Sequence, residues 1–346
     1  MKNTLINTHT PEFFLGIDVG KADLFCHLLG SPEHIACRFD NTDAGIQKLI
    51  FWLTKNTSED QVSACLEQTG HYGMKVSKAL YKLNIHSLFL VNPRQIKAFG
   101  QQKLRRNKSD TADAKLIARF LRSEHSELRA WQPKSIEHER ITELSRYAES
   151  IVRELAKLKT KCEAAYEPSI QRSLKRRIKF AEKEIADIRQ RIQKIISSSE
   201  PIKTQYKLIL SIPGMGEVSS QIMLAELPNI TQFKNARELA AWAGLTPCHF
   251  VSGTSGRATT PITKIGSTYL RQALFMPAMN ARVFNPLLKE FGDRLQANGK
   301  KPKQIIIAIM RKLIHQIYGI LKSQKPYNPE KSRANSSWGL RKDELF

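Results

Sequence analysis

The chain has 346 residues, of which 41% are hydrophobic, so it is long enough for two domains and a connector. Lys and Arg total 55 against 32 Asp and Glu, which gives a formal net charge of +23. A positive excess of this size favours a polyanionic partner such as nucleic acid, and the alternative is a basic surface that only maintains solubility. The five cysteines have no C-x-x-C spacing, which argues against a zinc ribbon or redox motif, and no apolar stretch has the length of a membrane span.

Strands and helices are predicted in alternation over the first third of the chain. Residues 13–17, 24–29 and 34–39 form apolar runs typical of strands. The elements that follow are a helix over 42–55, a strand over 61–66, a helix over 74–83, a strand over 86–91 and a helix over 110–121. This order predicts an α/β domain with a mixed sheet and helices on its faces, as in the RNase H-like fold.

The middle of the chain carries apolar residues at heptad spacing in two segments separated by Pro168. The seam residues are Leu144, Ala148, Ile151, Leu155, Leu158 and Cys162, followed by Leu174, Ile178, Ala181, Ile185, Ile188, Ile192 and Ile195. The spacing predicts a coiled-coil connector over 135–200, either folded back as a hairpin within one chain or paired with another subunit.

A helix-rich region follows the break at 197–201. Helices are predicted over 206–211, 218–227, 236–243, 268–281 and 304–321. We therefore expect an N-terminal α/β domain over 12–125, the connector over 135–200, a mainly helical C-terminal domain over 201–325 and a polar, disordered tail over 326–346.

Four carboxylates are predicted to meet in the first domain. Asp18 closes the first strand and Glu67 the fourth, and these two strands are neighbours in an RNase H-like sheet. Asp110 and Asp113 lie on one side of the helix after the fifth strand. Carboxylates this close repel each other unless a divalent cation neutralises them, and hard oxygen ligands favour Mg²⁺ or Mn²⁺ over zinc. Any one of these acids alone could instead cap a turn or begin a helix, so the prediction depends on all four.

Basic residues surround the second pair of acids. Between Pro93 and Arg122 the only acids are Asp110 and Asp113, and the basic residues are Arg94, Lys97, Lys103, Arg105, Arg106, Lys108, Lys115, Arg119 and Arg122. Such a stretch suits phosphate contacts beside a metal site. It argues against an actin-like ATPase, which opens with a segment similar to residues 16–20 but needs a second glycine-rich phosphate loop.

Two glycine-containing segments in the second half are candidates for DNA contact. Residues 211–216, which include Gly214 and Gly216, precede a helix in the pattern of a helix-hairpin-helix, where free N–H groups bind a phosphate. The alternative is an ordinary tight turn. Residues 252–257 contain Ser252, Ser255 and Arg257, and the residue types alone favour a phosphate-binding loop over a serine nucleophile.

Together these segments resemble the insertion-sequence transposases of the IS110 family, which include the Piv-type DNA invertases. The resemblance extends from about Phe14 to Pro326. The landmarks are Gly16-Ile17-Asp18, Cys65-Leu66-Glu67-Gln68-Thr69-Gly70, Asn92-Pro93, Asn107-Lys108-Ser109-Asp110-Thr111-Ala112-Asp113-Ala114, Ser211-Ile212-Pro213-Gly214-Met215-Gly216, Ala243-Gly244-Leu245-Thr246-Pro247, Ser252-Gly253 and Leu270-Arg271. Each landmark alone is weak, whereas their shared order is specific.

The resemblance implies a RuvC-like domain with a DEDD metal site, a coiled-coil connector and a C-terminal transposase domain. The acidic set falls on Asp18, Glu67, Asp110 and Asp113, and the family's nucleophilic serine falls on Ser252. The resemblance also implies a structured bridge RNA that pairs with donor and target DNA. Strand exchange would pass through a phosphoserine link, with the acidic site of one subunit completing the serine site of another.

One segment departs from the family pattern. Cys248 and His249 follow Gly-Leu-Thr-Pro where the family tends to have basic residues, which puts one phosphate contact in doubt but not the nucleophile. Ser255 is the alternative nucleophile.

We therefore expect a metal-dependent DNA transposase or site-specific recombinase, with magnesium or manganese as cofactor. Its partners would be donor and target DNA, the bridge RNA and further copies of the chain, as a dimer or as a tetramer on DNA, in the bacterial cytoplasm at the nucleoid and without a membrane. The expected nucleic-acid contacts are Lys103, Arg105, Arg106, Lys108, Gly214, Gly216, Arg257, Lys264 and Arg271. The alternatives are a RuvC-like nuclease or junction resolvase without serine chemistry, and a non-catalytic nucleic-acid-binding protein.

Overall fold

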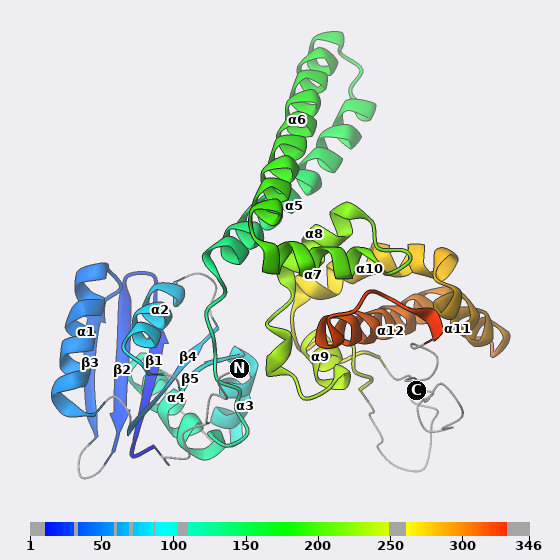
Figure 1. Cartoon of the computed structure of the whole chain (residues 1–346). Coiled ribbons are helices and arrows are strands. Elements are labelled where there is room, and N and C mark those ends of the chain that lie inside the picture. The colour runs from blue at the N-terminus through cyan, green and yellow to red at the C-terminus, as the bar shows by residue number, and fades with distance from the viewer. Residues whose placement is uncertain are drawn as a thin grey trace. The chain divides into compact units, whose positions relative to one another are not determined.

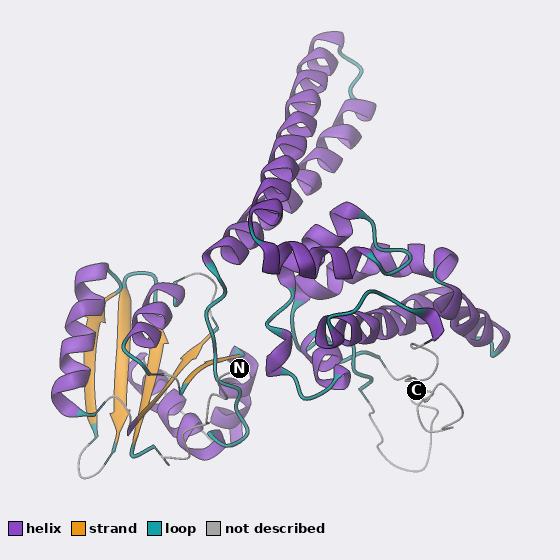
Figure 2. Cartoon of the chain, in the orientation of Figure 1, coloured by secondary structure: helices purple, strands orange, loops and turns teal. Residues whose placement is uncertain are grey.

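The computed structural model describes residues 11–30, 34–58, 61–68, 72–85, 87–102, 110–248 and 261–330. The chain divides into two compact units, Met1–Pro133 and Lys134–Phe346. Over the described residues, all five strands of the sheet belong to the first unit, and helices build the second (Figure 2).

A mixed five-stranded sheet forms the centre of the first unit. Its strands are β1 (Phe13–Val19), β2 (Asp23–Leu29), β3 (Ile35–Asp40), β4 (Val62–Glu67) and β5 (Leu88–Val91). They lie in the order β3-β2-β1-β4-β5, with β1, β2 and β3 antiparallel and β4 parallel to both β1 and β5 (Figure 1). The mixed sheet with flanking helices was predicted from the sequence and is confirmed, and its order is consistent with an RNase H-like fold.

Side chains of β1 alternate between the two faces of the sheet. Leu15, Ile17 and Val19 belong to a buried core that α1 (Asp43–Asn56) and α2 (Met74–Lys82) complete. The opposite face is covered by α3 (Pro93–Gln102) and α4 (Asp110–Glu124), whose apolar residues form a second core with β4 and β5. Asp18 lies on this second face.

Helix α3 was not predicted from the sequence, which suggested only that Asn92-Pro93 stops a strand. Pro93 is the first residue of α3, where the missing N–H of proline costs no hydrogen bond. The side chain of Asn92 accepts a hydrogen bond of 2.9 Å from the backbone N–H of Arg94. Asn92-Pro93 therefore ends the strand and also starts the next helix.

The second unit begins with a helical hairpin made of α5 (Ile136–Ala164) and α6 (Pro168–Ser198), which run side by side (Figure 1). The buried seam residues are Ala148, Ile151, Leu158, Leu174, Ala181, Ile185, Ile188, Ile192 and Ile195. The heptad seam is thus buried within one chain, in the hairpin arrangement that the spacing allowed.

The helices of the remaining body are α7 (Glu200–Leu210), α8 (Glu217–Glu226), α9 (Ala236–Trp242), α10 (Thr268–Phe284), α11 (Pro286–Ala297) and α12 (Pro302–Ser323). Helix α11 was not predicted, because it follows α10 with only Asn285 between them. Helix α12 is long and apolar enough to cross a membrane, contrary to our sequence expectation that no such stretch exists. In the structure 56% of that stretch is buried, and α12 packs against α7, α9, α10 and α11, as a core helix does.

A partly buried ion pair attaches the hairpin to this body. The guanidinium of Arg146 on α5 donates hydrogen bonds of 2.8 and 2.9 Å to the carboxylate of Glu226, whose side chain is only 5% exposed. The same guanidinium lies 4.3 Å from the ring centroid of Tyr269 on α10. Because removing one partner would leave the other charge unpaired, this pair holds α5, α8 and α10 in one arrangement.

His27 on β2 is a titratable group buried without hydrogen bonds. It is 5% exposed, and neither ring nitrogen has a partner within the described part of the chain. Burial, followed by the charges of Lys115, His34 and Arg119, lowers the pKa of His27 from 6.5 to about 4.

We predict that His27→Leu weakens the pH dependence of stability. The unfolded chain takes up this proton near its ordinary pKa and the folded chain only at lower pH, so acid reduces the free energy of unfolding. Between about pH 7 and pH 5 the variant should lose about 2 kcal/mol less than the wild type in urea unfolding. Equal losses would contradict a neutral, buried His27.

Candidate functional site

Gly16 allows α4 to lie directly on β1. A Cβ atom at this position would overlap with the backbone oxygen of Ala114 and the backbone nitrogen of Ala118. Gly16 precedes Asp18 by two residues, and Ala114 directly follows Asp113. The contact between Gly16 and α4 therefore sets how close the carboxylate of Asp18 comes to those of Asp110 and Asp113.

Three of the four predicted acids converge at this contact. Asp18, Asp110 and Asp113 each offer a carboxylate oxygen, and these oxygens all lie within 4.8 Å of one another. Asp110 is exposed and the other two are half-buried. Asp110 and Asp113 occupy the first turn of α4, where the helix dipole stabilises negative charge.

The spacing of these oxygens fits a small divalent cation. Mg²⁺ binds oxygen at about 2.0–2.1 Å, so two ligands of one ion lie at most about 4.2 Å apart. The oxygens of Asp18, Asp110 and Asp113, all within 4.8 Å of one another, are close to that limit. The donors are all carboxylates, which hard cations prefer.

Glu67 lies on the neighbouring strand and is not one of the three acids in that group. Ile17 of β1 pairs with Leu66 of β4 in the parallel ladder. Asp18 and Glu67 each follow one of these residues, so both stand at the same level on the face covered by α4. Glu67 is half-buried. The structure thus places the fourth acid beside the group of three.

Cys65 lies on the same face, paired in the sheet with Gly16. Burial, followed by the charge of Glu67, raises the pKa of the Cys65 thiol well above its ordinary value. The neutral thiol is a poor metal ligand. The group whose ligand atoms converge at this end of the sheet consists of the carboxylates of Asp18, Asp110 and Asp113.

The predicted nucleophile, Ser252, lies outside the described residues, as do Ser255 and Arg257. The predicted phosphate contacts Lys103, Arg105, Arg106 and Lys108 also lie outside them. The described residues on either side of the segment 249–260, here called the serine segment, are joined by backbone hydrogen bonds. Cys248 N–H donates to the Pro261 carbonyl at 2.8 Å, and Thr263 N–H donates to the Thr246 carbonyl at 2.9 Å. The two ends of the segment 249–260 therefore meet at one point of the second unit.

Lys264 and Arg271 lie beside this point but differ in their surroundings. The Arg271 guanidinium is half-buried and donates a hydrogen bond of 2.9 Å to the carbonyl of Ala243, at the start of the Gly-Leu-Thr-Pro turn. Lys264 is exposed, and its φ of 54° is a left-handed conformation that lysine rarely adopts. Arg271 thus supports the turn, a role the sequence did not suggest, while Lys264 presents its charge to solvent.

The two glycines of the predicted helix-hairpin-helix motif, Gly214 and Gly216, have different environments. Gly214 has a φ of 98°, and a Cβ there would lie 2.6 Å from the Cα of Ala281 on α10. Gly216 caps α8, and a Cβ there would have no atom within 4 Å. Packing against α10 accounts for Gly214, whereas Gly216 leaves the start of α8 open.

Comparison with known proteins agrees with this geometry. A family model of the DEDD type of IS110 proteins, described as a transposase, matches residues 15–167. A second model, described as a transposase of the IS116/IS110/IS902 family, matches residues 206–293. The chain is 31% identical over 319 residues to the pilin gene-inverting protein of Moraxella bovis, covering 91% of this chain and 97% of that protein. It is 24% identical over 298 residues to a probable family 20 transposase of Pseudomonas aeruginosa, covering 75% of this chain and 81% of that protein.

The chain belongs to the IS110 transposase family. It is therefore an enzyme of DNA transposition and recombination. The match over 15–167 contains the acids of this transposase, and the match over 206–293 contains Ser252. The DEDD family and the carboxylate cluster together indicate the use of a divalent metal.

We predict that Gly16→Ala separates α4 from β1 in this transposase. Overpacking of this kind costs about 1–3 kcal/mol and should also move Asp110 and Asp113 away from Asp18. We expect reduced stability in urea unfolding and weaker Mn²⁺ binding by calorimetry.

Gly73→Ala is the matched control, because a Cβ at Gly73 would meet only Val19, at 3.9 Å. It should leave metal binding unchanged. Wild-type affinity for Mn²⁺ in Gly16→Ala would show that the contact does not determine the cluster.

Proposed function

We propose that this transposase exchanges DNA strands by combining a carboxylate metal site with a serine nucleophile. Asp18, Glu67, Asp110 and Asp113 would hold the metal, and Ser252 would attack the DNA. The observation that carries the proposal is the convergence of three carboxylates where α4 meets β1, within a chain of a DEDD transposase family. The name of the pilin gene-inverting relatives supports DNA inversion or transposition as the outcome.

The chemistry divides between residues of the two units. A Mg²⁺ or Mn²⁺ ion held by the acids would supply positive charge at the reacting phosphate. The Ser252 oxygen would bond to phosphorus as a deoxyribose oxygen leaves and takes up a proton. Attack by the hydroxyl of a second strand would then release the serine and complete the exchange. Arg257 and Lys264 would stabilise the charge that develops on phosphorus.

We propose that a structured bridge RNA selects the donor and target DNA by base pairing, as the family resemblance implies. The net charge of +23 supports binding of both the RNA and the two DNAs. The proposed nucleic-acid contacts are Lys103, Arg105, Arg106, Lys108, Gly214, Gly216, Arg257, Lys264 and Arg271.

We also propose that the active enzyme is a dimer, or a tetramer on DNA. In it the acidic site of one subunit would complete the serine site of another. The presence of the two sets of residues in separate compact units supports this arrangement. The proposed domains are 12–125 for the RuvC-like domain, 135–200 for the connector and 201–325 for the transposase domain.

We expect the double variant Asp110→Asn, Asp113→Asn to lose strand exchange. Amides keep the shape of the side chains but remove the charge that holds the cation. Mutation of residues that only orient metal ligands already lowers activity about 10- to 100-fold. Loss of two ligands should therefore lower strand exchange by more than that. Recombination of a two-site plasmid in the presence of the bridge RNA measures the effect. Full activity in this variant would exclude the metal site.

We expect Ser252→Ala to abolish both strand exchange and the covalent protein–DNA adduct, while Ser255→Ala retains them. Denaturing gel electrophoresis of labelled DNA detects the adduct. If Ser252→Ala and Ser255→Ala both still cleave DNA, the enzyme acts as a metal-dependent nuclease without serine chemistry.

A further inference from the structure

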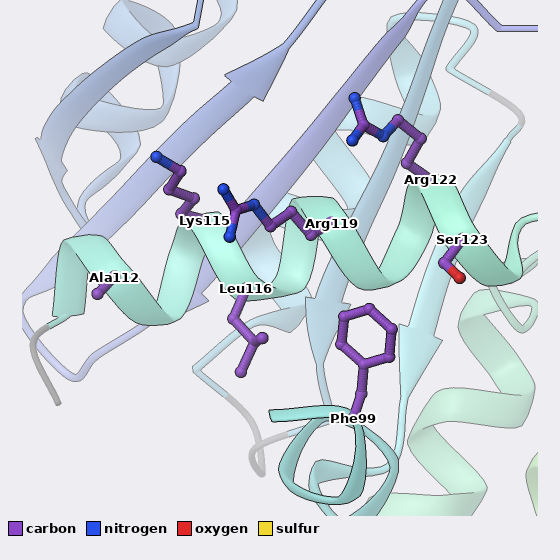
Figure 3. Close-up of a pocket in the computed structure, with 7 residues that line it drawn as sticks. All are labelled: Phe99, Ala112, Lys115, Leu116, Arg119, Arg122 and Ser123. Atoms are coloured by element: carbon purple, nitrogen blue, oxygen red, sulfur yellow. The ribbon is translucent and has the colours of Figure 1, made fainter. Parts of the chain in front are cut away.

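A pocket of about 700 Å³ lies along helix α4 of the first unit. It is lined by Phe99 of α3 and by six residues of α4, namely Ala112, Lys115, Leu116, Arg119, Arg122 and Ser123 (Figure 3). Its volume is within the range of about 300–1,000 Å³ that accommodates small organic molecules. A single nucleotide belongs to this size class.

The apolar side of the pocket is rigidly built. Gly100 is buried against Leu116, and a Cβ there would lie 2.9 Å from a terminal methyl carbon of Leu116. Phe99 packs edge-to-face with Phe120, with ring centroids 5.5 Å apart at 80°. Phe99 is half-buried, so part of its surface faces the pocket. An aromatic ring held in one orientation is a suitable stacking partner for a base.

The opposite side of the pocket carries three cations. Lys115, Arg119 and Arg122 follow each other at intervals of four and three residues and extend from one side of α4, while Leu116 and Phe99 lie on the other side (Figure 3). Within the described ranges none of the three forms an ion pair. They span about 10 Å along the helix axis.

The cations and the carboxylates occupy nearly opposite sides of α4. At 3.6 residues per turn, Asp110 and Asp113 lie nearly opposite Lys115 and Arg119 on the helix. Lys115 is half-buried and Arg119 is exposed. Lys115 is only two residues beyond Asp113, so the cationic row begins within one turn of the metal site. A DNA strand that passes around the start of α4 can contact both groups.

We propose that this pocket holds an unpaired nucleotide of the DNA strand, with its base against Phe99 and adjacent phosphates on Lys115, Arg119 and Arg122. The choice of DNA rests on the proposed function. An unpaired strand is favoured because the paired bases of a duplex are stacked on their neighbours and cannot enter a pocket. The cations then align the backbone beside the carboxylates.

Salt dependence of binding tests the phosphate contacts. The full-length protein is titrated with a fluorescent single-stranded DNA in EDTA, so that metal binding plays no part. Removing three phosphate contacts by K115Q, R119Q and R122Q together should reduce the slope of log affinity against log salt by about 2. The matched control is K48Q, K55Q and K82Q, three exposed lysines of α1 and α2 across the sheet. Equal reductions in both triple variants would overturn the proposal.

Phe99→Leu tests the base contact. Loss of one base–aromatic stack should weaken single-strand binding about five- to 150-fold, with no effect on a fully paired duplex. An abasic site is then placed at each position of the DNA in turn. At one position it should weaken binding by the wild type but cause no further loss of affinity in Phe99→Leu, because the stacked base is already missing its partner. An equal loss on duplex, or the absence of such a position, would contradict an inserted base. Tighter binding of RNA of the same sequence would overturn the assignment to DNA.

The Asp110→Asn, Asp113→Asn variant separates this proposal from the proposed function. It should still show the Phe99→Leu effect in the binding assay, because the pocket does not need the metal. Strand exchange by this carboxylate variant would refute the metal chemistry and leave the binding result intact. If Phe99→Leu no longer weakens binding in the carboxylate variant, and that variant unfolds at the wild-type temperature, the pocket does not act independently of the carboxylates.

Discussion

The close contact of α4 with β1 at Gly16 is the constraint on which the metal cluster depends. The backbone of Ala114 and Ala118 occupies the space that any side chain at position 16 would need. Because interiors are densely packed, such a contact limits how far apart the two elements can lie. Asp18 therefore meets Asp110 and Asp113 at a distance suited to one cation, although almost a hundred residues separate them in the chain.

Helix α4 combines two opposite kinds of electrostatics in one element. Its first turn carries two acids toward the end of the sheet, where the helix dipole favours them. Its outward side carries Lys115, Arg119 and Arg122. A polyanion would be repelled by the carboxylates alone, and the cations offset this repulsion within one helix. The arrangement explains why the acids stand within so basic a stretch.

The second unit uses buried polar contacts to hold its helices. Asn285 is fully buried, and its amide donates to the Gln316 side chain at 3.1 Å, while its oxygen accepts from Leu288 N–H and Tyr327 Oη. These contacts join the start of α11 to α12 and to the segment after it. Together with the Arg146–Glu226 pair, which joins α5 to α8, they connect the helices of the second unit through polar contacts.

The sequence by itself determined the mixed sheet, the two-helix seam and which acids are candidates, because these follow from local apolar periodicity and from residue type. It missed α3 and α11, since Pro93 and Pro286 also look like simple breaks, and helix starts marked by Asn-Pro carry a weak local signal. Only the tertiary structure decided that the heptads pack within one chain, that Gly214 packs against α10, and that the carboxylates of Asp18, Asp110 and Asp113 lie within 4.8 Å of one another. Each of these depends on contacts between residues distant in the chain, whose distances no local pattern encodes.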